Sequence, residues 1–141
     1  GEGRILCASA GLRPTQGARP PDEAVIAAAR YGLSLAGHLP RPVTGELVES
    51  HDLIVVMEAG QLEFLRSNFP QVANRTVLLS LFDSDGRTGY ERYNIADPFS
   101  QPLEVYEVCY RRIDRAATSL MAGICSGRAA VPAAASEGNP L

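Results

Sequence analysis

The chain has 141 residues, a length that fits one domain. Its net charge of −3, with 21% charged residues, excludes the strongly basic surface that nucleic-acid binding requires. The longest apolar runs, residues 53–57 and 77–79, are far too short to cross a bilayer, and residues 1–4 do not resemble a signal peptide. We therefore expect a cytoplasmic protein that binds neither nucleic acid nor membrane.

The cysteines are three, at widely separated positions: Cys7, Cys109 and Cys125. An odd number with wide gaps does not form a disulfide framework or a typical zinc site. We expect reduced thiols in a reducing compartment and no bound metal.

Apolar periodicity predicts strands and helices that alternate along the chain. In order, these are a strand at 4–9, a helix at 21–31, a short helix at 44–49, a strand at 52–57, a helix at 61–69, a strand at 76–81 and a helix at 103–121. Pro21 suits the first turn of its helix, and Thr44 can cap the next one. The continuous apolar runs of the last two strands are typical of strands buried on both faces.

The remaining segments are predicted from composition. Residues 83–93 read as a polar loop, and residues 122–141, rich in Ala, Gly, Ser and Pro, as a disordered tail that follows a domain at 1–121. The last helix carries three arginines that we expect on a solvated face: Arg111, Arg112 and Arg115. We expect them to pair with acidic residues of the same helix: Glu104, Glu107 and Asp114.

Strands that alternate with helices imply an α/β fold of three layers, with a short parallel sheet between helices. The sheet would have only three strands and a thin core.

Four short motifs follow one another in a fixed order: Ser9-Ala10-Gly11-Leu12, Leu33-Ser34-Leu35-Ala36-Gly37-His38, Asp52-Leu53-Ile54-Val55-Val56-Met57-Glu58 and Ala96-Asp97-Pro98-Phe99. With this order, residues 5–121 resemble the low-molecular-weight protein-tyrosine phosphatases, and most closely the bacterial branch that acts on tyrosine kinases of capsule and exopolysaccharide export. The resemblance implies hydrolysis of phosphotyrosine on proteins, including a bacterial tyrosine kinase, through a phosphocysteine and without metal or cofactor.

The same resemblance aligns residue 5 with the second strand of the family. The family's first strand, its phosphate loop (Cys, five residues, Arg, then Ser or Thr) and its first helix then have no counterpart in residues 1–141. We therefore expect an N-terminally truncated, inactive chain that self-associates through exposed strand edges. The alternative is a catalytically dead binding or regulatory domain of the same fold. Arsenate reduction on this fold would need a relay of further cysteines, which the positions of Cys109 and Cys125 do not suit.

One pair of residues has the spacing of the phosphate loop. Cys7 and Arg13 are separated by five residues, but Pro14 follows the arginine, and further prolines and Gly17 delay the next helix to about residue 21. A phosphate loop needs free N–H groups at a helix that starts directly after it. We therefore do not expect Cys7 to be a nucleophile, and we expect a buried strand thiol instead.

The resemblance assigns roles to four other residues. Asp97 corresponds to the general acid that protonates the departing tyrosine oxygen, and Phe99 corresponds to a residue that walls the substrate cleft. Ser9 and His38 correspond to groups that hydrogen-bond to the phosphate loop and hold its shape. His51 is expected to lie on the surface.

Overall fold

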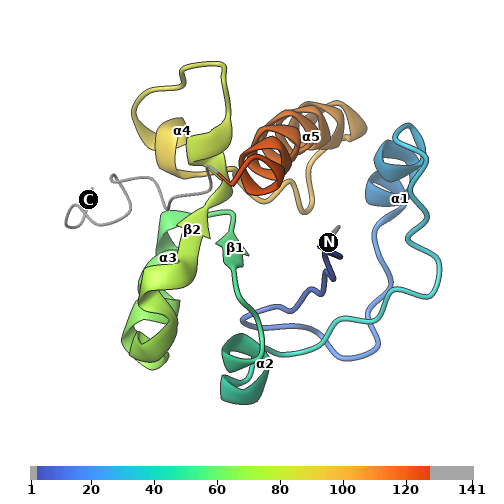
Figure 1. Ribbon diagram of the computed structural model, residues 1–141. Coiled ribbons are helices and arrows are strands. Elements are labelled where there is room, and N and C mark those ends of the chain that lie inside the picture. Colours follow the sequence, from blue (N-terminus) through green and yellow to red (C-terminus); the bar gives the residue numbers. More distant parts are fainter. Residues whose placement is uncertain (1–2, 128–141) are drawn as a thin grey trace.

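The computed structural model describes residues 3–127 (Figure 1). Its elements, in chain order, are α1 (Asp22–Ala29), α2 (Gly45–Glu49), β1 (Ile54–Val56), α3 (Ala59–Asn68), the 3₁₀ helix η1 (Pro70–Arg75), β2 (Thr76–Leu78), the 3₁₀ helix η2 (Leu79–Phe82), α4 (Tyr90–Tyr93) and α5 (Leu103–Cys125). Every predicted helix is present. None of the helices in this part of the chain is long and apolar enough to cross a membrane.

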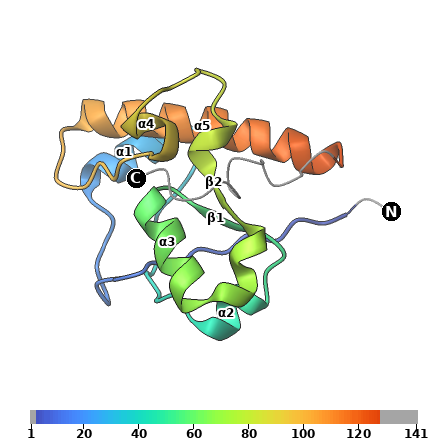
Figure 2. The same ribbon diagram turned by 90° about the vertical axis from the view of Figure 1, so that its left-hand side faces the viewer.

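The sheet consists of β1 and β2, which run parallel with Val55 opposite Val77. Figure 2 shows it as the middle layer, with α5 and α1 on one side and α2 and α3 on the other. Parallel strands covered on both sides by helices confirm the predicted α/β class.

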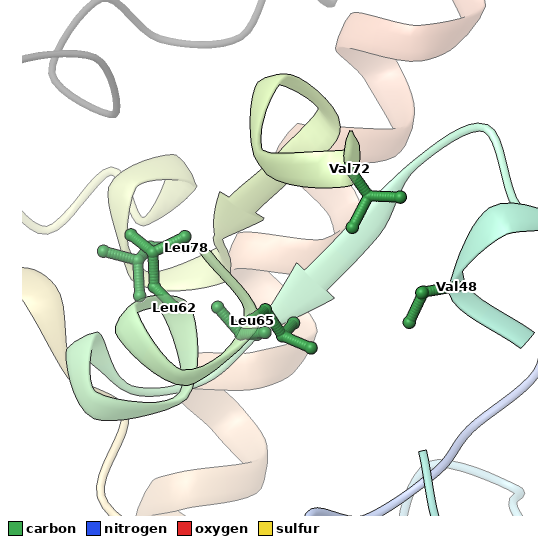
Figure 3. Packing of buried hydrophobic residues seen from close by; sticks show 6 residues of the cluster. Val48, Leu62, Leu65, Val72 and Leu78 are labelled. Atoms are coloured by element: carbon green, nitrogen blue, oxygen red, sulfur yellow. The ribbon is translucent and has the colours of Figure 1, made fainter. Parts of the chain in front are cut away.

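One face of the sheet packs against α2, α3 and η1. Val56 of β1 and Leu78 of β2 meet Leu62 and Leu65 of α3, together with Val48 and Val72 (Figure 3). Leu78 is 2% exposed and Val72 is fully buried, so this cluster forms one of the cores of the molecule. The predicted cap of α2 is confirmed, because the Leu47 amide donates to Thr44 Oγ1 at 3.1 Å.

The other face packs against α5. Leu79 and Ile95 are buried against Ala116 and Leu120, with Leu53 and Met57 beside them. On the far side of α5, Tyr106 packs against Ala24 and Ala27 of α1. Ile54 and Val56 thus pack in the first cluster, whereas Leu53 and Met57 pack in the second. These contacts on both faces explain why the run is continuously apolar.

The prediction of a strand at 4–9 is wrong. This segment is extended but belongs to no sheet, and all its side chains are exposed, including Cys7. Within residues 3–127, the first backbone pairing is at Gly11, which forms an isolated bridge with Pro42. An apolar run becomes a strand only when a neighbouring strand satisfies its N–H and C=O groups, and none lies beside this one.

Several boundaries also differ from the predictions, three of them in ways that change the type of element. The strand predicted at 76–81 turns into η2 after Leu78, and the loop predicted at 83–93 contains the short helix α4. Helix α5 continues to Cys125, four residues into the predicted tail, and residues 128–141 lie outside the described part.

Two of the three arginines of α5 do not lie on a solvated face. Arg112 is buried and its Nε donates to Asp83 at 2.8 Å, while Arg115 donates to the same carboxylate at 2.6 Å. Glu107, predicted to pair within α5, instead binds Arg30, the residue that follows α1, at 2.7 Å. Only Arg111 is exposed as predicted.

Candidate active site

The Asp97 loop lies between α4 and α5 and is attached to the end of β1. The Ile95 amide donates to the carbonyl of Met57, the residue that follows β1, at 2.8 Å. Sites of α/β proteins form at the carboxyl ends of their strands. This hydrogen bond therefore holds the Asp97 loop at the carboxyl end of β1.

Asp97 shapes its own loop. Its Oδ1 accepts a hydrogen bond from the Phe99 amide at 3.0 Å, which closes a tight turn around Pro98. The next residue, Ser100, has φ of 64°, and Gln101 donates to the Pro98 carbonyl at 2.9 Å. Asp97 and Phe99 are both exposed, Phe99 at 66%, so both are free to meet a ligand.

The negative charge of Asp97 contributes to the raised pKa of two side chains of α5. Burial, and to a smaller extent the charges of Glu23 and Asp97, raise the pKa of Tyr106. Burial and the Asp97 charge also raise the pKa of Cys109, whose thiol contacts the Ala96 carbonyl at 3.8 Å. Both groups are therefore neutral at neutral pH and add no competing charge beside Asp97.

A groove of about 410 Å³ lies between the N-terminal segment and β1. Residues 8–12 and residues 53–57 line it, together with parts of α2 and α3. Ser9 is one of the lining residues. Arg41 Nε donates to the Ser9 carbonyl at 2.9 Å, and the Gly11 amide donates to the Arg41 carbonyl at 2.9 Å. Arg41 thus fixes the position of the segment at 8–12 that lines the groove. The sequence did not reveal this role, because Ser9 lies 32 positions away from Arg41.

His51, expected on the surface, is half-buried and lines the groove. Its Nδ1 lies 2.7 Å from the Leu47 carbonyl. His38, by contrast, is exposed in the loop after α1, where its amide donates to the Leu35 carbonyl at 3.1 Å. Among the described residues, no hydrogen bond or ion pair joins Ser9, His38 and Asp97, so only Asp97 and Phe99 are brought into direct contact.

Two cysteines of residues 3–127 have an arginine six positions later, and no helix begins directly after either arginine. After Cys7 and Arg13, the chain forms turns and bends until α1 begins at Asp22. Cys109 and Arg115 have the same spacing, but both lie inside α5, where backbone amides bond within the helix. Arg115 is also occupied by Asp83 and Asp85.

Comparison with known proteins connects this arrangement to a family. Residues 1–130 match the family described as "Low molecular weight phosphotyrosine protein phosphatase". The chain belongs to this family. The resemblance seen in the order of the short motifs is thereby confirmed, and the matched segment includes the Asp97 loop.

Similar proteins come from bacteria, in agreement with the bacterial branch. One is the "Probable low molecular weight protein-tyrosine-phosphatase AmsI" of Erwinia amylovora, 29% identical over 110 residues that cover 78% of this chain and 72% of the relative. The crystal structure of Erwinia amylovora AmsI superposes with a TM-score of 0.71 at 26% identity, covering 81% of this chain and 71% of AmsI. The structure of Vibrio vulnificus Wzb in complex with benzylphosphonate gives a TM-score of 0.62 at 27% identity, with 74% and 66% of the two chains covered.

Proposed function

We propose that this chain carries the acid side of a protein-tyrosine phosphatase site, with Asp97 as the general acid and Phe99 at the wall of the substrate cleft. The observation that carries the proposal is the anchoring of the Asp97 loop to the carbonyl that follows β1, in a chain of this family. Both side chains are exposed at that edge of the sheet.

The proposed reaction runs in two steps. A cysteine thiolate attacks phosphorus and the bond to the tyrosine oxygen breaks, while the Asp97 carboxylic acid gives its proton to that oxygen. Water then attacks the phosphocysteine and gives its proton to the Asp97 carboxylate, which releases phosphate and the thiolate. Each step needs a carboxyl group that is accessible to the ligand, and the exposure of Asp97 supports this role.

The substrate class that we propose is a phosphotyrosine protein, including a tyrosine kinase of the same cell. Two observations support an aromatic phosphate monoester. The sequence relative AmsI is named a probable protein-tyrosine-phosphatase, and Vibrio vulnificus Wzb is described with benzylphosphonate, in which a methylene group joins the phosphonate to an aromatic ring. The exposed ring of Phe99 offers a surface on which an aromatic group can stack.

We further propose that residues 1–141 by themselves do not catalyse the reaction. The support is the setting of Cys7 and Cys109, since neither lies before a helix N-terminus that could bind phosphate. An acid without a nucleophile and without donors for the phosphoryl oxygens gives little catalysis. Ser9 and His38, which we expect to support a phosphate loop, would then have no partner within this chain.

The experiment is hydrolysis of para-nitrophenyl phosphate by residues 1–141, with the Cys7→Ser variant beside it. We expect no turnover above the buffer in either protein. Turnover that disappears in Cys7→Ser would show that Cys7 is the nucleophile and would overturn this part of the proposal. Binding of a phosphotyrosine peptide without turnover would favour the alternative, a binding or regulatory domain.

A further inference from the structure

Asn94 is a buried polar residue shortly before Asp97 in the chain, and it is 6% exposed. Its side-chain amide is paired at both polar atoms. Oδ1 accepts a hydrogen bond from the Ala59 amide at 3.0 Å, and Nδ2 donates to the Tyr90 carbonyl at 2.9 Å. Because Ala59 lies 35 positions away, one side chain joins two segments that are distant in sequence. A buried amide with both polar atoms paired holds its surroundings in one arrangement.

Ala59 is the first residue of α3, the helix that follows β1. The first amides of a helix have no partner within the helix and need acceptors from elsewhere. Gln61 Oε1 accepts hydrogen bonds from the amides of Met57 and Glu58, at 2.9 and 3.2 Å. Asn94 supplies the acceptor for the Ala59 amide. Asn94 thus caps α3 from outside the helix, at the carboxyl end of β1.

The backbone around Asn94 is held as well. The Asn94 carbonyl accepts a hydrogen bond from Arg112 Nη1 at 2.7 Å, and the Ile95 amide donates to the Met57 carbonyl at 2.8 Å. Ile95 is 3% exposed and packs against α5. Asp97, in contrast, is exposed, and its carboxylate closes its own turn. The position of Asp97 relative to β1 therefore depends on the anchors that precede it.

We propose that Asn94 is a positioning residue for Asp97, whose side-chain amide fixes the Asp97 loop on the junction of β1 and α3. The inference rests on the proposed function, in which Asp97 gives a proton to the departing oxygen. Proton transfer needs the carboxyl group about 2.6–3.2 Å from that oxygen. A displacement of about 1 Å is enough to lose such a geometry. Asn94 acts through the loop and does not touch the substrate.

Amide hydrogen exchange in residues 1–141 tests the anchoring directly. In Asn94→Ala we expect the Ile95 amide to exchange about tenfold faster or more, relative to the amides of the β1–β2 ladder, because the lost hydrogen bonds hold the loop and not the sheet. The matched control is Thr76→Val, which removes another buried side-chain hydrogen bond, from Thr76 Oγ1 to the Val72 carbonyl at 2.8 Å. It should not speed exchange of the loop relative to the ladder.

Cys109 provides a second readout of where the Asp97 carboxylate lies. Its thiol contacts the Ala96 carbonyl at 3.8 Å, and burial together with the Asp97 charge raises its pKa. Asp97→Asn should therefore lower the pKa of Cys109, measured from the pH dependence of alkylation at this thiol. In the Asn94→Ala background the same replacement should change this pKa much less, because the loop no longer holds the carboxylate beside the thiol. The Thr76→Val background should keep the full effect.

Asn94→Asp takes the place of Asn94→Ala if that variant does not fold. Its carboxylate can still accept from the Ala59 amide but cannot donate to the Tyr90 carbonyl, so both changes should persist to a smaller extent. Loop exchange that does not rise relative to the ladder, or an Asp97→Asn effect on Cys109 that stays complete in the Asn94 variants, would overturn the inference. Neither readout uses turnover, so the kinetics of Asp97→Asn test the proposed function separately.

Discussion

Asp83 and Arg112 form a buried ion pair that joins η2 to α5. Arg112 Nε donates to Asp83 Oδ2 at 2.8 Å, and the two side chains are 1% and 9% exposed for Asp83 and Arg112 respectively. Arg112 also donates to the carbonyls of Asn94 and Glu91, at the two ends of the segment that leads to Asp97. The pair therefore positions the Asp97 loop as well as the helix.

Asp83→Asn should destabilise the protein by roughly 3 kcal/mol, because it leaves the buried Arg112 without its counter-charge. The measurement is unfolding in urea or guanidinium chloride. Asp85→Asn is the matched control, since Asp85 is 46% exposed, and it should cost less than about 1 kcal/mol. Equal effects of the two variants would contradict the role given to the buried pair.

The same carboxylate should make stability depend on pH at the acid end. Hydrogen bonds from Arg115 and Arg112 hold the pKa of Asp83 far below its usual range. A carboxyl whose folded-state pKa is lowered stabilises the fold at every pH above its unfolded pKa, about 3.9, and loses this effect as the pH falls toward its folded pKa. The stability difference between the original chain and Asp83→Asn should be constant from pH 7 to 5 and shrink below about pH 4. A constant difference down to pH 3 would contradict the assignment.

Leu78→Ala should cost about 2–5 kcal/mol, because it opens a cavity in the cluster between the sheet and α3. Leu39→Ala removes the same atoms from a side chain that is 74% exposed and should change the stability by less than about 0.5 kcal/mol. Thermal or chemical unfolding of the two variants measures both effects. Similar losses would mean that the core does not lie where the structure places it.

The three thiols should differ in reactivity. Cys7 and Cys125 are exposed, whereas Cys109 is partly buried in α5 with a pKa raised by burial and by the charge of Asp97. A thiol reagent at pH 7.5, a value chosen at about one unit below an ordinary thiol pKa, should modify two thiols quickly and Cys109 slowly. Asp97→Asn removes the nearby charge and should speed the reaction of Cys109. An unchanged rate in that variant would show that burial alone controls this thiol.

Local patterns predicted the parts of the fold that depend on neighbouring residues. The cap at Thr44 and the burial of residues 76–78 could be inferred from a few adjacent side chains. The burial predicted for the strand at 52–57 is confirmed only in part, because Val56 is buried but Val55 is 37% exposed. The Asp97 loop could be found because its motif is contiguous, although the catalytic role of Asp97 stays a prediction.

Contacts between distant residues could not be predicted in this way. The sequence placed Arg112 on a solvated face because its partner Asp83 is 29 positions away and no local periodicity reveals it. The strand predicted at 4–9 failed for a related reason. Its apolar pattern is that of a strand, but whether such a segment pairs depends on what lies beside it.

The measurement that tests the central claim most directly compares para-nitrophenyl phosphate hydrolysis by three proteins. These are residues 1–141, a version with a family-type strand, phosphate loop and helix placed ahead of Gly1, and the same version with Asp97→Asn. We expect turnover only in the extended proteins, with kcat lowered on the order of 10²-fold by Asp97→Asn. Equal kcat in the two extended proteins, or Cys7-dependent turnover by residues 1–141, would contradict the account.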